Sequence, residues 1–335
     1  MYPMHPLDLT QANTLALPCL ADQGMTIRSV SEARASWRAL KAQGMPLTVL
    51  GGGSNVLLPP RLRGIVWRLA APAPRLERHG RVEAFGGVVL DELIQIVGEA
   101  GLWGLENLAA IPGTLGAAPV QNVGAYGQSL DEVVESLEVL DLRSGQVARW
   151  SRIQAAFAYR DSLFRRQPGA YCILSLRLRL HAKGTANLRY DGVRERVDAL
   201  GVAGAALRPP HLSAAIRALR SEKLPDWHRC PNVGSFFKNP VLSQDAWARL
   251  RARAPMLALG PYGRTGGKVS AAQLIEGAGW RGRRRGPVGM AARHALVLLN
   301  YGGATRADVL WLAGTVQASV YAHYGVRLER EPLLL

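Results

Sequence analysis

The sequence between residues 111 and 127 reads IPGTLGAAPVQNVGAYG, a stretch rich in glycine and alanine and without a charged side chain. Small side chains let the backbone approach an extended, flat ligand closely. The amides of Gln121 and Asn122 can bind the heteroatoms of such a ligand. The stretch therefore predicts a loop that lines a planar molecule.

A second glycine-rich segment, Gly51 to Asn55, follows a short buried strand predicted over residues 46–50. Successive glycine amides can form an anion-binding nest, and Ser54 and Asn55 add side-chain donors. Taken alone, the segment is equally typical of a plain loop. Together the two segments suit a dinucleotide, with its pyrophosphate at the triglycine and its aromatic ring system at residues 111–127.

Residues 277–282, GAGWRG, match the dinucleotide fingerprint G-x-G-x-x-G literally. The fingerprint has a mechanism only after a strand and before a helix. Here it follows a predicted helix over residues 270–276 and precedes an arginine-rich loop. We interpret it as a helix C-terminal cap.

The formal net charge of +16 suggests a nucleic-acid partner. The arginines are spread along the chain, however, and alternate with leucine over residues 176–180, as in a strand with one solvated face. The dense cluster of Arg281 with residues 283–285 lacks interleaved aromatic residues. We interpret the charge as solvated surface that can also steer an anionic small molecule, and we expect no nucleic-acid partner.

Length and composition predict a folded protein of two or three domains, with 335 residues of which 48% are hydrophobic. No apolar run is long enough to span a membrane, and residues 1–5 lack the pattern of a signal peptide. We therefore expect a cytoplasmic location and no membrane partner. Cys19, Cys172 and Cys230 share no metal-ligand spacing and predict neither a disulfide framework nor a metal site.

Helices and strands alternate along the chain without internal repeats. The pattern predicts a hairpin with its turn at Ser144-Gly145, a strand over residues 171–180 and a final strand over residues 326–335. The predicted helices cover residues 31–42, 91–100, 213–222, 270–276 and 306–323. Domain boundaries are predicted near residues 70–74 and at Pro209-Pro210.

Polar chemistry concentrates in residues 234–240, GSFFKNP, with Lys223-Leu224-Pro225 shortly upstream. The chain holds only five lysines, and two of them, Lys223 and Lys238, lie near Ser235. A compact ammonium is not interchangeable with a planar guanidinium. This stretch is therefore a second candidate site.

Six motifs carry a resemblance to a known family. In chain order they are GGGSN, IPGTLGAAPVQNVGAYG, FAYRDSLF, KLPD with GSFFKNP, KVSAAQLIEGAGWRG and LEREP. This set resembles the UDP-N-acetylenolpyruvoylglucosamine reductases, flavoenzymes of bacterial peptidoglycan precursor synthesis. The resemblance implies an α+β fold with a two-part FAD-binding module of the vanillyl-alcohol oxidase (PCMH) type and a smaller α/β substrate-binding domain. The implied parts are residues 1–71 with 326–335, residues 72–210 and residues 211–325.

Matched position by position, the resemblance implies three catalytic residues. Ser235 would donate a proton, while Arg160 and Glu331 would stabilise charge on the substrate carboxylate. FAD would be held by Gly51, Gly52, Gly53, Ser54, Asn55, Ile111, Pro112, Gly113, Gly116, Gln121, Asn122, Gly124, Ala125, Arg160 and Arg220. The UDP-sugar would be held by Tyr126, Tyr190, Lys223, Asn239 and His294. NADPH is the implied hydride donor, no metal is implied, and we expect a monomer.

The implied reaction needs these residue types. Reduction of an enol ether of pyruvate adds hydride to the terminal carbon and leaves negative charge delocalised into the carboxylate. An arginine can pair with that carboxylate, and one fixed donor aimed at developing charge contributes about 3–4 kcal/mol. Protonation of the neighbouring carbon needs a well-placed weak acid, a role that a serine hydroxyl can fill.

Some positions depart from the family pattern or leave alternatives open. The last motif contains two glutamates, so Glu329 competes with Glu331 for the catalytic role, and Leu333 replaces a basic substrate contact. Tyr190, in the stretch NLRYDG, suggests the subclass with a loop that folds over the bound sugar. An alcohol or sugar oxidase of the same flavin fold and a basic nucleic-acid-binding protein are the alternative classes.

Overall fold

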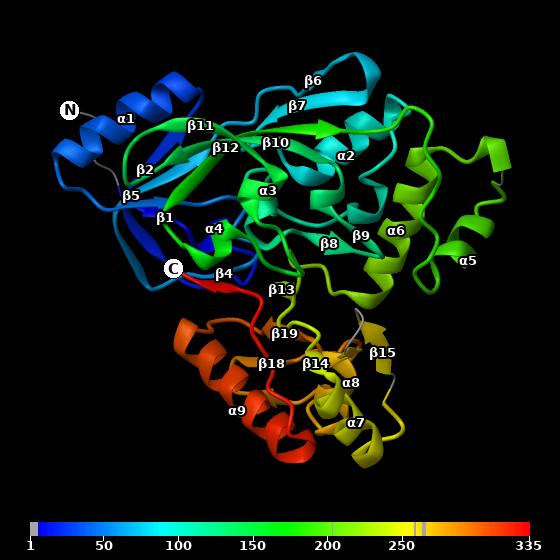
Figure 1. The fold of residues 1–335 in the computed structure, drawn as a ribbon. Helices are drawn as coiled ribbons and strands as arrows, with labels where there is room; N and C mark the ends of the chain where they lie inside the picture. The colour runs from blue at the N-terminus through cyan, green and yellow to red at the C-terminus, as the bar shows by residue number, and fades with distance from the viewer. Residues whose placement is uncertain (1–5, 203, 258, 263–265) are drawn as a thin grey trace. The chain divides into compact units, whose positions relative to one another are not determined.

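The computed structural model describes residues 6–202, 204–257, 259–262 and 266–335. Residues 1–5, on which the expectation of no signal peptide depends, lie outside this part. The chain divides into two compact units (Figure 1). Unit 1 comprises Met1–Leu7, Ala21–Gly53 and Leu62–Glu222, and unit 2 comprises Asp8–Leu20, Ser54–Arg61 and Lys223–Leu335. The three-part division given above stays a prediction.

Unit 1 is built mainly on two sheets, with strand orders β1-β2-β5-β3 and β11-β10-β12-β7-β6, and on a short β8-β9 pair. The strands are β1 (Leu7–Asp8), β2 (Leu20–Ile27), β3 (Leu47–Val49), β5 (Arg61–Leu69), β6 (Arg75–Leu76), β7 (Arg81–Phe85), β8 (Gly124–Ala125), β9 (Gln128–Ser129), β10 (Val134–Asp141), β11 (Val147–Ser151) and β12 (Tyr171–Arg179). The helices are α1 (Val30–Ala42), α2 (Leu90–Glu99), α3 (Arg152–Ala155), α4 (Leu163–Arg166), α5 (Val193–Asp198) and α6 (Pro209–Lys223).

The five-stranded sheet of unit 1 has two buried faces. Leu176 and Leu178 of β12 pack with α2 in one core, whereas Cys172 and Leu174 pack with α1 and Trp67 in another. The predicted hairpin is confirmed, since β10 and β11 pair in antiparallel register from Ser136 with Ser151 to Leu140 with Val147. The second half of β12 has the solvated face that was predicted for residues 176–180. The first half of the strand is buried on both faces.

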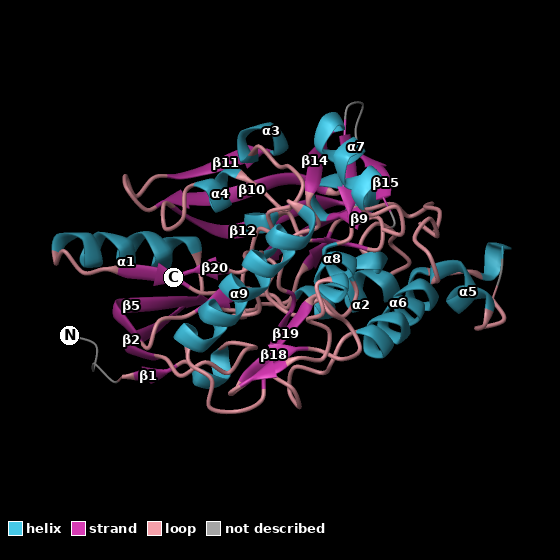
Figure 2. Cartoon of the chain, turned by 90° about the horizontal axis from the view of Figure 1, so that it is seen from below, coloured by secondary structure: helices cyan, strands magenta, loops and turns pink. Residues whose placement is uncertain are grey.

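Unit 2 combines two small sheets, β13-β19-β18-β17 and β14-β16-β15, with three helices around one core. The strands are β4 (Val56–Leu57), β13 (Asn232–Ser235), β14 (Val241–Ser243), β15 (Leu259–Tyr262), β16 (Gly266–Val269), β17 (Arg284–Arg285), β18 (Val288–Met290), β19 (Val297–Asn300) and β20 (Leu333–Leu334). The helices are α7 (Gln244–Arg253), α8 (Ala271–Gly277) and α9 (Arg306–Tyr324). The mixture of helices and strands in Figure 2 makes the chain α+β, as predicted.

The C-terminal segment differs from the predicted long strand. Only Leu333–Leu334 form a strand, β20, which pairs in parallel with Val56–Leu57 of β4. Upstream, Arg330 makes an isolated bridge with Phe237. The strand prediction over residues 326–335 was therefore wrong in length, although the apolar segment does return to a core through Val326 and Leu328.

The start of α6 and the end of α8 can be compared with the predicted boundaries. Helix α6 begins at Pro209, four residues before the predicted start, because proline is tolerated in a first helical turn. Helix α8 ends at Gly277, and Gly279 adopts a left-handed φ of 77° while its N–H donates to Glu276 O. The interpretation of GAGWRG as a helix C-terminal cap is confirmed.

Candidate active site

The two glycine-rich segments of unit 1 lie against each other. A Cβ added to Gly52 would stand 2.8 Å from Gly113 Cα, and one added to Gly51 would stand 2.6 Å from Thr114 Oγ1. Real Cβ atoms are not found at such separations from backbone, so glycine is required for the two loops to pack. The sequence analysis predicted that these two segments bind one dinucleotide, and in the structure they are in direct contact.

The triglycine also fits an anion. In the described part of the chain, no protein acceptor is paired with the backbone N–H groups of Gly51, Gly52 and Gly53. Gly53 has a left-handed φ of 64°, a conformation that turns successive amides toward one side. Ser54 and Asn55 follow directly, and the Asn55 side chain donates to Glu331 O at 3.4 Å within unit 2. These donors suit a pyrophosphate.

The loop over residues 111–125 is held by close backbone packing. A Cβ on Gly116 would stand 2.8 Å from Ile173 O and 3.0 Å from Gly86 Cα. Gly86 and Gly87, which the sequence analysis did not single out, are equally crowded, since a Cβ on Gly87 would stand 2.1 Å from Leu69 O. At the end of β7, Gly86 therefore packs directly against this loop, and Gly87 packs against the end of β5.

Asn122 has a structural role that the sequence analysis did not predict. Its side chain donates to Asp131 Oδ1 at 2.9 Å and to Ala158 O at 3.2 Å, and it accepts from Asp131 N at 3.1 Å. The amide is buried and engaged within the protein, so what it offers a ligand is its backbone. Gln121 is the last residue of the short 3-10 helix Ala118–Gln121, which Asn122 caps.

Arg160 lies in a tight turn that Asn122 supports. Ala158 and Asp161 exchange both backbone hydrogen bonds, at 3.0 and 3.2 Å, and Arg160 has a left-handed φ of 52°. Such a backbone is unfavourable for a residue with a Cβ and is often found at functional sites. The guanidinium reaches Gly124, where an added Cβ would stand 3.0 Å from Arg160 Nη1. The turn therefore brings a cation to the glycine-rich loop.

Tyr126, Tyr190 and Arg220 form a second group in unit 1. The two tyrosine rings meet edge to face with centroids 4.9 Å apart. Burial raises the pKa of Tyr126 above its ordinary value, while hydrogen bonding to Arg220 opposes the rise. Burial lowers the pKa of Arg220, and the neighbouring charge of Arg160 acts in the same direction. Arg220 thus lies near both the Tyr126 phenol and the Arg160 guanidinium, a set that suits an anion.

Asp91 is a further residue that the sequence analysis missed at this site. Its carboxylate accepts from Ala110 N at 2.6 Å, directly before the glycine-rich loop, and pairs with Arg217 on α6. Its charge also opposes the fall in the pKa of Arg220 and so favours the charged guanidinium. Asp91 lies in the first turn of α2, where an acidic side chain is favoured by the helix dipole. From the sequence, this position therefore indicated only the start of a helix.

In unit 2 the segment of Ser235 pairs with the C-terminal motif. Glu331 N donates to Phe236 O at 2.9 Å, and Lys238 N donates to Glu329 O at 2.8 Å. Glu331 is only 8% exposed. The Glu329 side chain is 67% exposed and its carboxylate pairs with Lys238. The geometry favours Glu331 over Glu329 as the partner of Ser235.

Lys223, His294 and Asn239 also belong to unit 2. Burial lowers the pKa of His294, and the charge of Lys223 lowers it further. His294 Nδ1 accepts from Leu296 N at 3.3 Å, which leaves Nε2–H as a donor in the neutral ring. Asn239 Oδ1 accepts from Ala271 N at 2.9 Å at the start of α8. The amide nitrogen is therefore the part of this side chain that can donate to a ligand.

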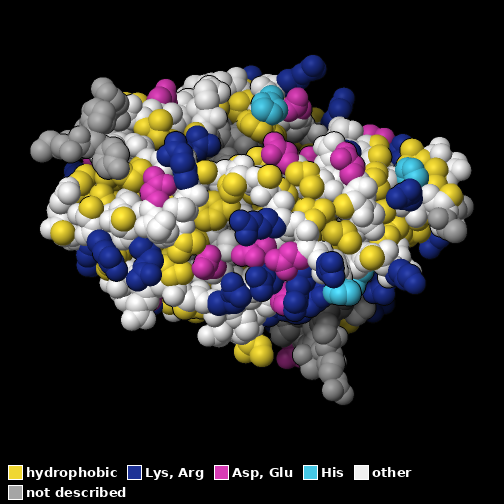
Figure 3. All heavy atoms as spheres, turned by 90° about the horizontal axis from the view of Figure 1, so that it is seen from above, with side chains coloured by type: hydrophobic (Ala, Val, Ile, Leu, Met, Phe, Trp, Pro, Cys, Tyr) yellow, Lys and Arg dark blue, Asp and Glu magenta, His cyan; other side chains and the backbone are white. Residues whose placement is uncertain are grey.

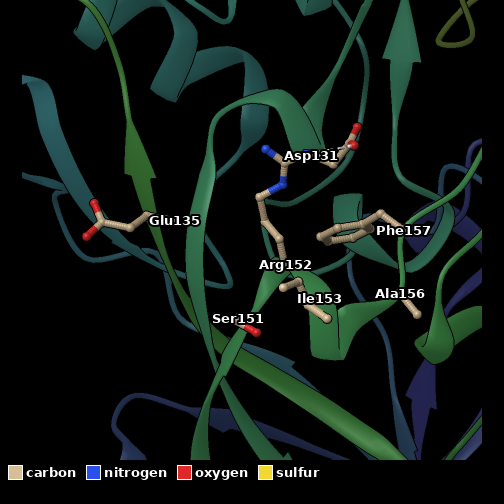
Figure 4. A pocket seen from close by; sticks show the side chains of 7 residues that line it. All are labelled: Asp131, Glu135, Ser151, Arg152, Ile153, Ala156 and Phe157. Atoms are coloured by element: carbon tan, nitrogen blue, oxygen red, sulfur yellow. Dashed lines mark ion pairs between the residues drawn. The ribbon is translucent and has the colours of Figure 1, made fainter.

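A hollow of about 520 Å³ lies elsewhere in unit 1, beside α3 (Figure 4). Asp131 and Arg152 line it and pair at 3.6 Å, and the other lining side chains include Glu135 and Phe157. None of the predicted site residues lines this hollow. It borders the described residues through Asp131, which hydrogen-bonds Asn122.

The described residues contain no group of three or more His, Cys, Asp or Glu that could hold a metal ion, and no helix among them is long and apolar enough to cross a membrane. On the face drawn in Figure 3, lysine and arginine side chains are interspersed with acidic and apolar ones. On that face, the arrangement agrees with the interpretation of the net charge as solvated surface.

Comparison with known proteins gives the class. Residues 22–151, which include both glycine-rich segments, match the FAD-binding domain family. The chain is therefore a flavoprotein with an FAD-binding module, as the glycine-rich loops indicated.

The remainder gives the family. Residues 225–335 match the C-terminal domain of UDP-N-acetylenolpyruvoylglucosamine reductase. The chain is 42% identical to that reductase from Pseudomonas aeruginosa over 96% of each chain, and 42% identical to that from Azoarcus sp. over 98% of this chain and 96% of the relative. The chain belongs to the UDP-N-acetylenolpyruvoylglucosamine reductase family. The reductase of Thermus caldophilus, at 24% identity, shares the fold with a TM-score of 0.69 over 99% of this chain and 98% of its own.

Proposed function

We propose that this protein reduces the enolpyruvyl group of UDP-N-acetylenolpyruvoylglucosamine to give UDP-N-acetylmuramate, with NADPH as reductant and FAD as the bound cofactor. Membership of the reductase family supports the activity. The observation that supports the residue assignment is the backbone pairing of the Ser235 segment with the segment of the buried Glu331.

The residues of the two glycine-rich segments suit the cofactor. The amides of Gly51, Gly52 and Gly53, with Ser54 and Asn55, would hold the pyrophosphate of FAD. Ile111, Pro112, Gly113, Gly116 and Gln121 to Ala125 would line the ring system, with Arg160 and Arg220 close by. When bound, FAD supplies hydride transfer from NADPH to the enolpyruvyl double bond.

The catalytic residues would then manage charge and protons. Arg160, set in its strained turn, would pair with the substrate carboxylate where negative charge develops. Glu331 would help to stabilise the charge that develops there. Ser235 would deliver the proton to the carbon next to that carboxylate, where its placement matters more than its acidity.

The remaining residues would bind the UDP-sugar. Lys223 and the Nε2–H of a neutral His294 offer donors to phosphate and sugar oxygens, and the nitrogen of the Asn239 amide offers another. Tyr126 and Tyr190 would contact the nucleotide-sugar, with Arg220 next to Tyr126. Tyr190 lies in a loop of unit 1 and is 44% exposed, which suits a residue that closes over a ligand.

The location and assembly are also part of this proposal. A nucleotide-sugar substrate made from cytoplasmic precursors suits a cytoplasmic monomer with no nucleic-acid or membrane partner. Light scattering on a gel-filtration column should give the mass of one chain.

The activity is tested by turnover. The purified protein should oxidise NADPH continuously, beyond one equivalent per flavin, only when the enolpyruvyl sugar is present, and mass spectrometry should show UDP-N-acetylmuramate. Oxygen consumption with a sugar or alcohol, without need for the enolpyruvyl group, would instead indicate an oxidase.

A further inference from the structure

Asn107 is a fully buried polar residue that none of the roles above uses. It lies in the short 3-10 helix Glu106–Leu108 of unit 1 and is 0% exposed. Its side-chain amide donates to Tyr126 O at 2.8 Å and to Asn187 O at 2.9 Å. Its backbone N–H donates to Gln128 Oε1 at 3.1 Å. Among the described residues, Oδ1 has no hydrogen-bond partner, so the side chain acts through its two donated bonds.

The two carbonyls that Asn107 binds belong to the segments of the tyrosine pair. Tyr126 has a left-handed φ of 49°, which needs support from its surroundings. Asn187 lies three residues before Tyr190 and returns a hydrogen bond from its side chain to Gly127 O at 2.9 Å. The backbones beneath both rings are therefore joined at Asn107, while the rings themselves meet at 4.9 Å.

We propose that Asn107 is a positioning residue for substrate binding, which sets the Tyr126 and Tyr190 rings in register by fixing their backbones to each other. This inference rests on the proposed function, because it assumes that the two tyrosines hold the UDP-sugar. Asn107 itself touches no substrate. Loss of its amide leaves two buried carbonyls without donors and frees the two segments to move independently.

The Asn107→Ala variant should separate sugar binding from flavin reduction. We expect the KM for the enolpyruvyl sugar and the Kd of UDP-N-acetylmuramate, measured by calorimetry, to rise about tenfold or more. The rate of flavin reduction by NADPH in stopped flow should stay within about twofold, since that step uses neither tyrosine. In combination with Tyr190→Phe, the effects on Kd should be less than additive, because both changes act on one contact.

Asn13→Ala is the matched control. Asn13 is also a buried asparagine whose amide donates to backbone carbonyls, those of Leu9, Thr10 and Leu17, and all its bonds lie within unit 2. It should lower the melting temperature as Asn107→Ala does but leave KM and Kd unchanged. If Asn107→Ala fails to fold, Gln128→Ala removes the bond that anchors the Asn107 backbone and should raise the same Kd more weakly.

The outcomes are distinct. A wild-type protein that neither oxidises NADPH with the sugar nor binds UDP-N-acetylmuramate overturns the proposed function. With an active wild type, an Asn107→Ala or Gln128→Ala variant that folds and binds the product normally overturns the positioning role. So does an Asn107→Ala variant that slows both half-reactions equally.

Discussion

Glu331 donates its backbone N–H to the carbonyl of Phe236 at 2.9 Å, and this bond fixes the register between the C-terminal motif and the segment of Ser235. Arg330 and Phe237 make the adjacent bridge. Ser235 and Glu331 are separated by nearly a third of the chain, yet they occupy neighbouring positions on one small structural unit. Their relative placement follows from unit 2 alone.

Replacement of Ser235 by alanine should affect one half-reaction. The variant loses only the hydroxyl, so NADPH should reduce the flavin at a normal rate. Reoxidation by the enolpyruvyl sugar should slow on the order of 10² or more, because the carbon loses its positioned acid. Stopped-flow absorbance resolves the two steps. Equal slowing of both would remove the proton-donor assignment.

The two glutamates of the last motif should differ. Glu331→Gln changes a buried carboxylate and should slow reoxidation by the sugar on the order of 10². Glu329→Gln breaks an exposed ion pair with Lys238, which contributes at most about 1 kcal/mol to stability, and should leave the rate nearly unchanged. A large defect in Glu329→Gln with a normal Glu331→Gln would reverse the assignment.

Gly52→Ala tests the contact between the two glycine-rich loops. The added methyl would stand 2.8 Å from Gly113 Cα, and neither backbone can yield cheaply. We expect a loss of about 1–3 kcal/mol in stability and a lower FAD content in the purified protein. The control is Gly314→Ala in α9, where a Cβ meets nothing within 4 Å. This change should be neutral or stabilise by up to about 1 kcal/mol.

The pKa of His294 should respond to Lys223. Burial and the lysine charge hold it below the ordinary histidine value of 6.5, so Lys223→Met should raise the pKa while leaving it below 6.5, because burial is the larger cause. An NMR titration of the histidine rings measures this, with His294→Gln for assignment. Lys41→Met, on α1 in unit 1, should change nothing. A fall in the pKa of His294 in Lys223→Met would contradict the placement.

The lowered pKa of His294 also determines the direction in which this residue changes stability at acid pH. Its pKa is lower in the folded protein, so near pH 6.5 and below the unfolded chain binds more protons and stability falls as the pH decreases. Chemical unfolding between neutral and mildly acid pH should show a shallower loss of stability in His294→Gln than in the wild type. An unchanged slope would mean that the ring titrates normally.

Much of the site could be predicted because its signals are local. The triglycine and the 111–127 loop stand out by composition, and glycine has a direct physical reason at Gly51 and Gly52. The cap at residues 277–282 and the β10–β11 hairpin could likewise be predicted from residues close together in the sequence. Family resemblance then supplied the roles of Ser235, Arg160 and Glu331, which single residues could not.

Long-range polar contacts could not be predicted. Asn107 and Asn187 are 80 residues apart and nothing in either neighbourhood indicates their bond. Asn122 seemed available to a ligand because its partners, Asp131 and Ala158, lie in other elements. The sequence also could not decide between Glu329 and Glu331, since a regular strand places residues i and i+2 on one face. Exposure distinguishes them instead, since Glu331 is 8% exposed and the Glu329 side chain is 67% exposed.

The visible spectrum of the purified protein through one redox cycle tests the central claim most directly. Held without oxygen, the protein should be yellow, bleach on addition of NADPH and regain its colour on addition of UDP-N-acetylenolpyruvoylglucosamine. A colourless protein with no affinity for FAD, or a bleached flavin that the sugar cannot restore, would contradict the account.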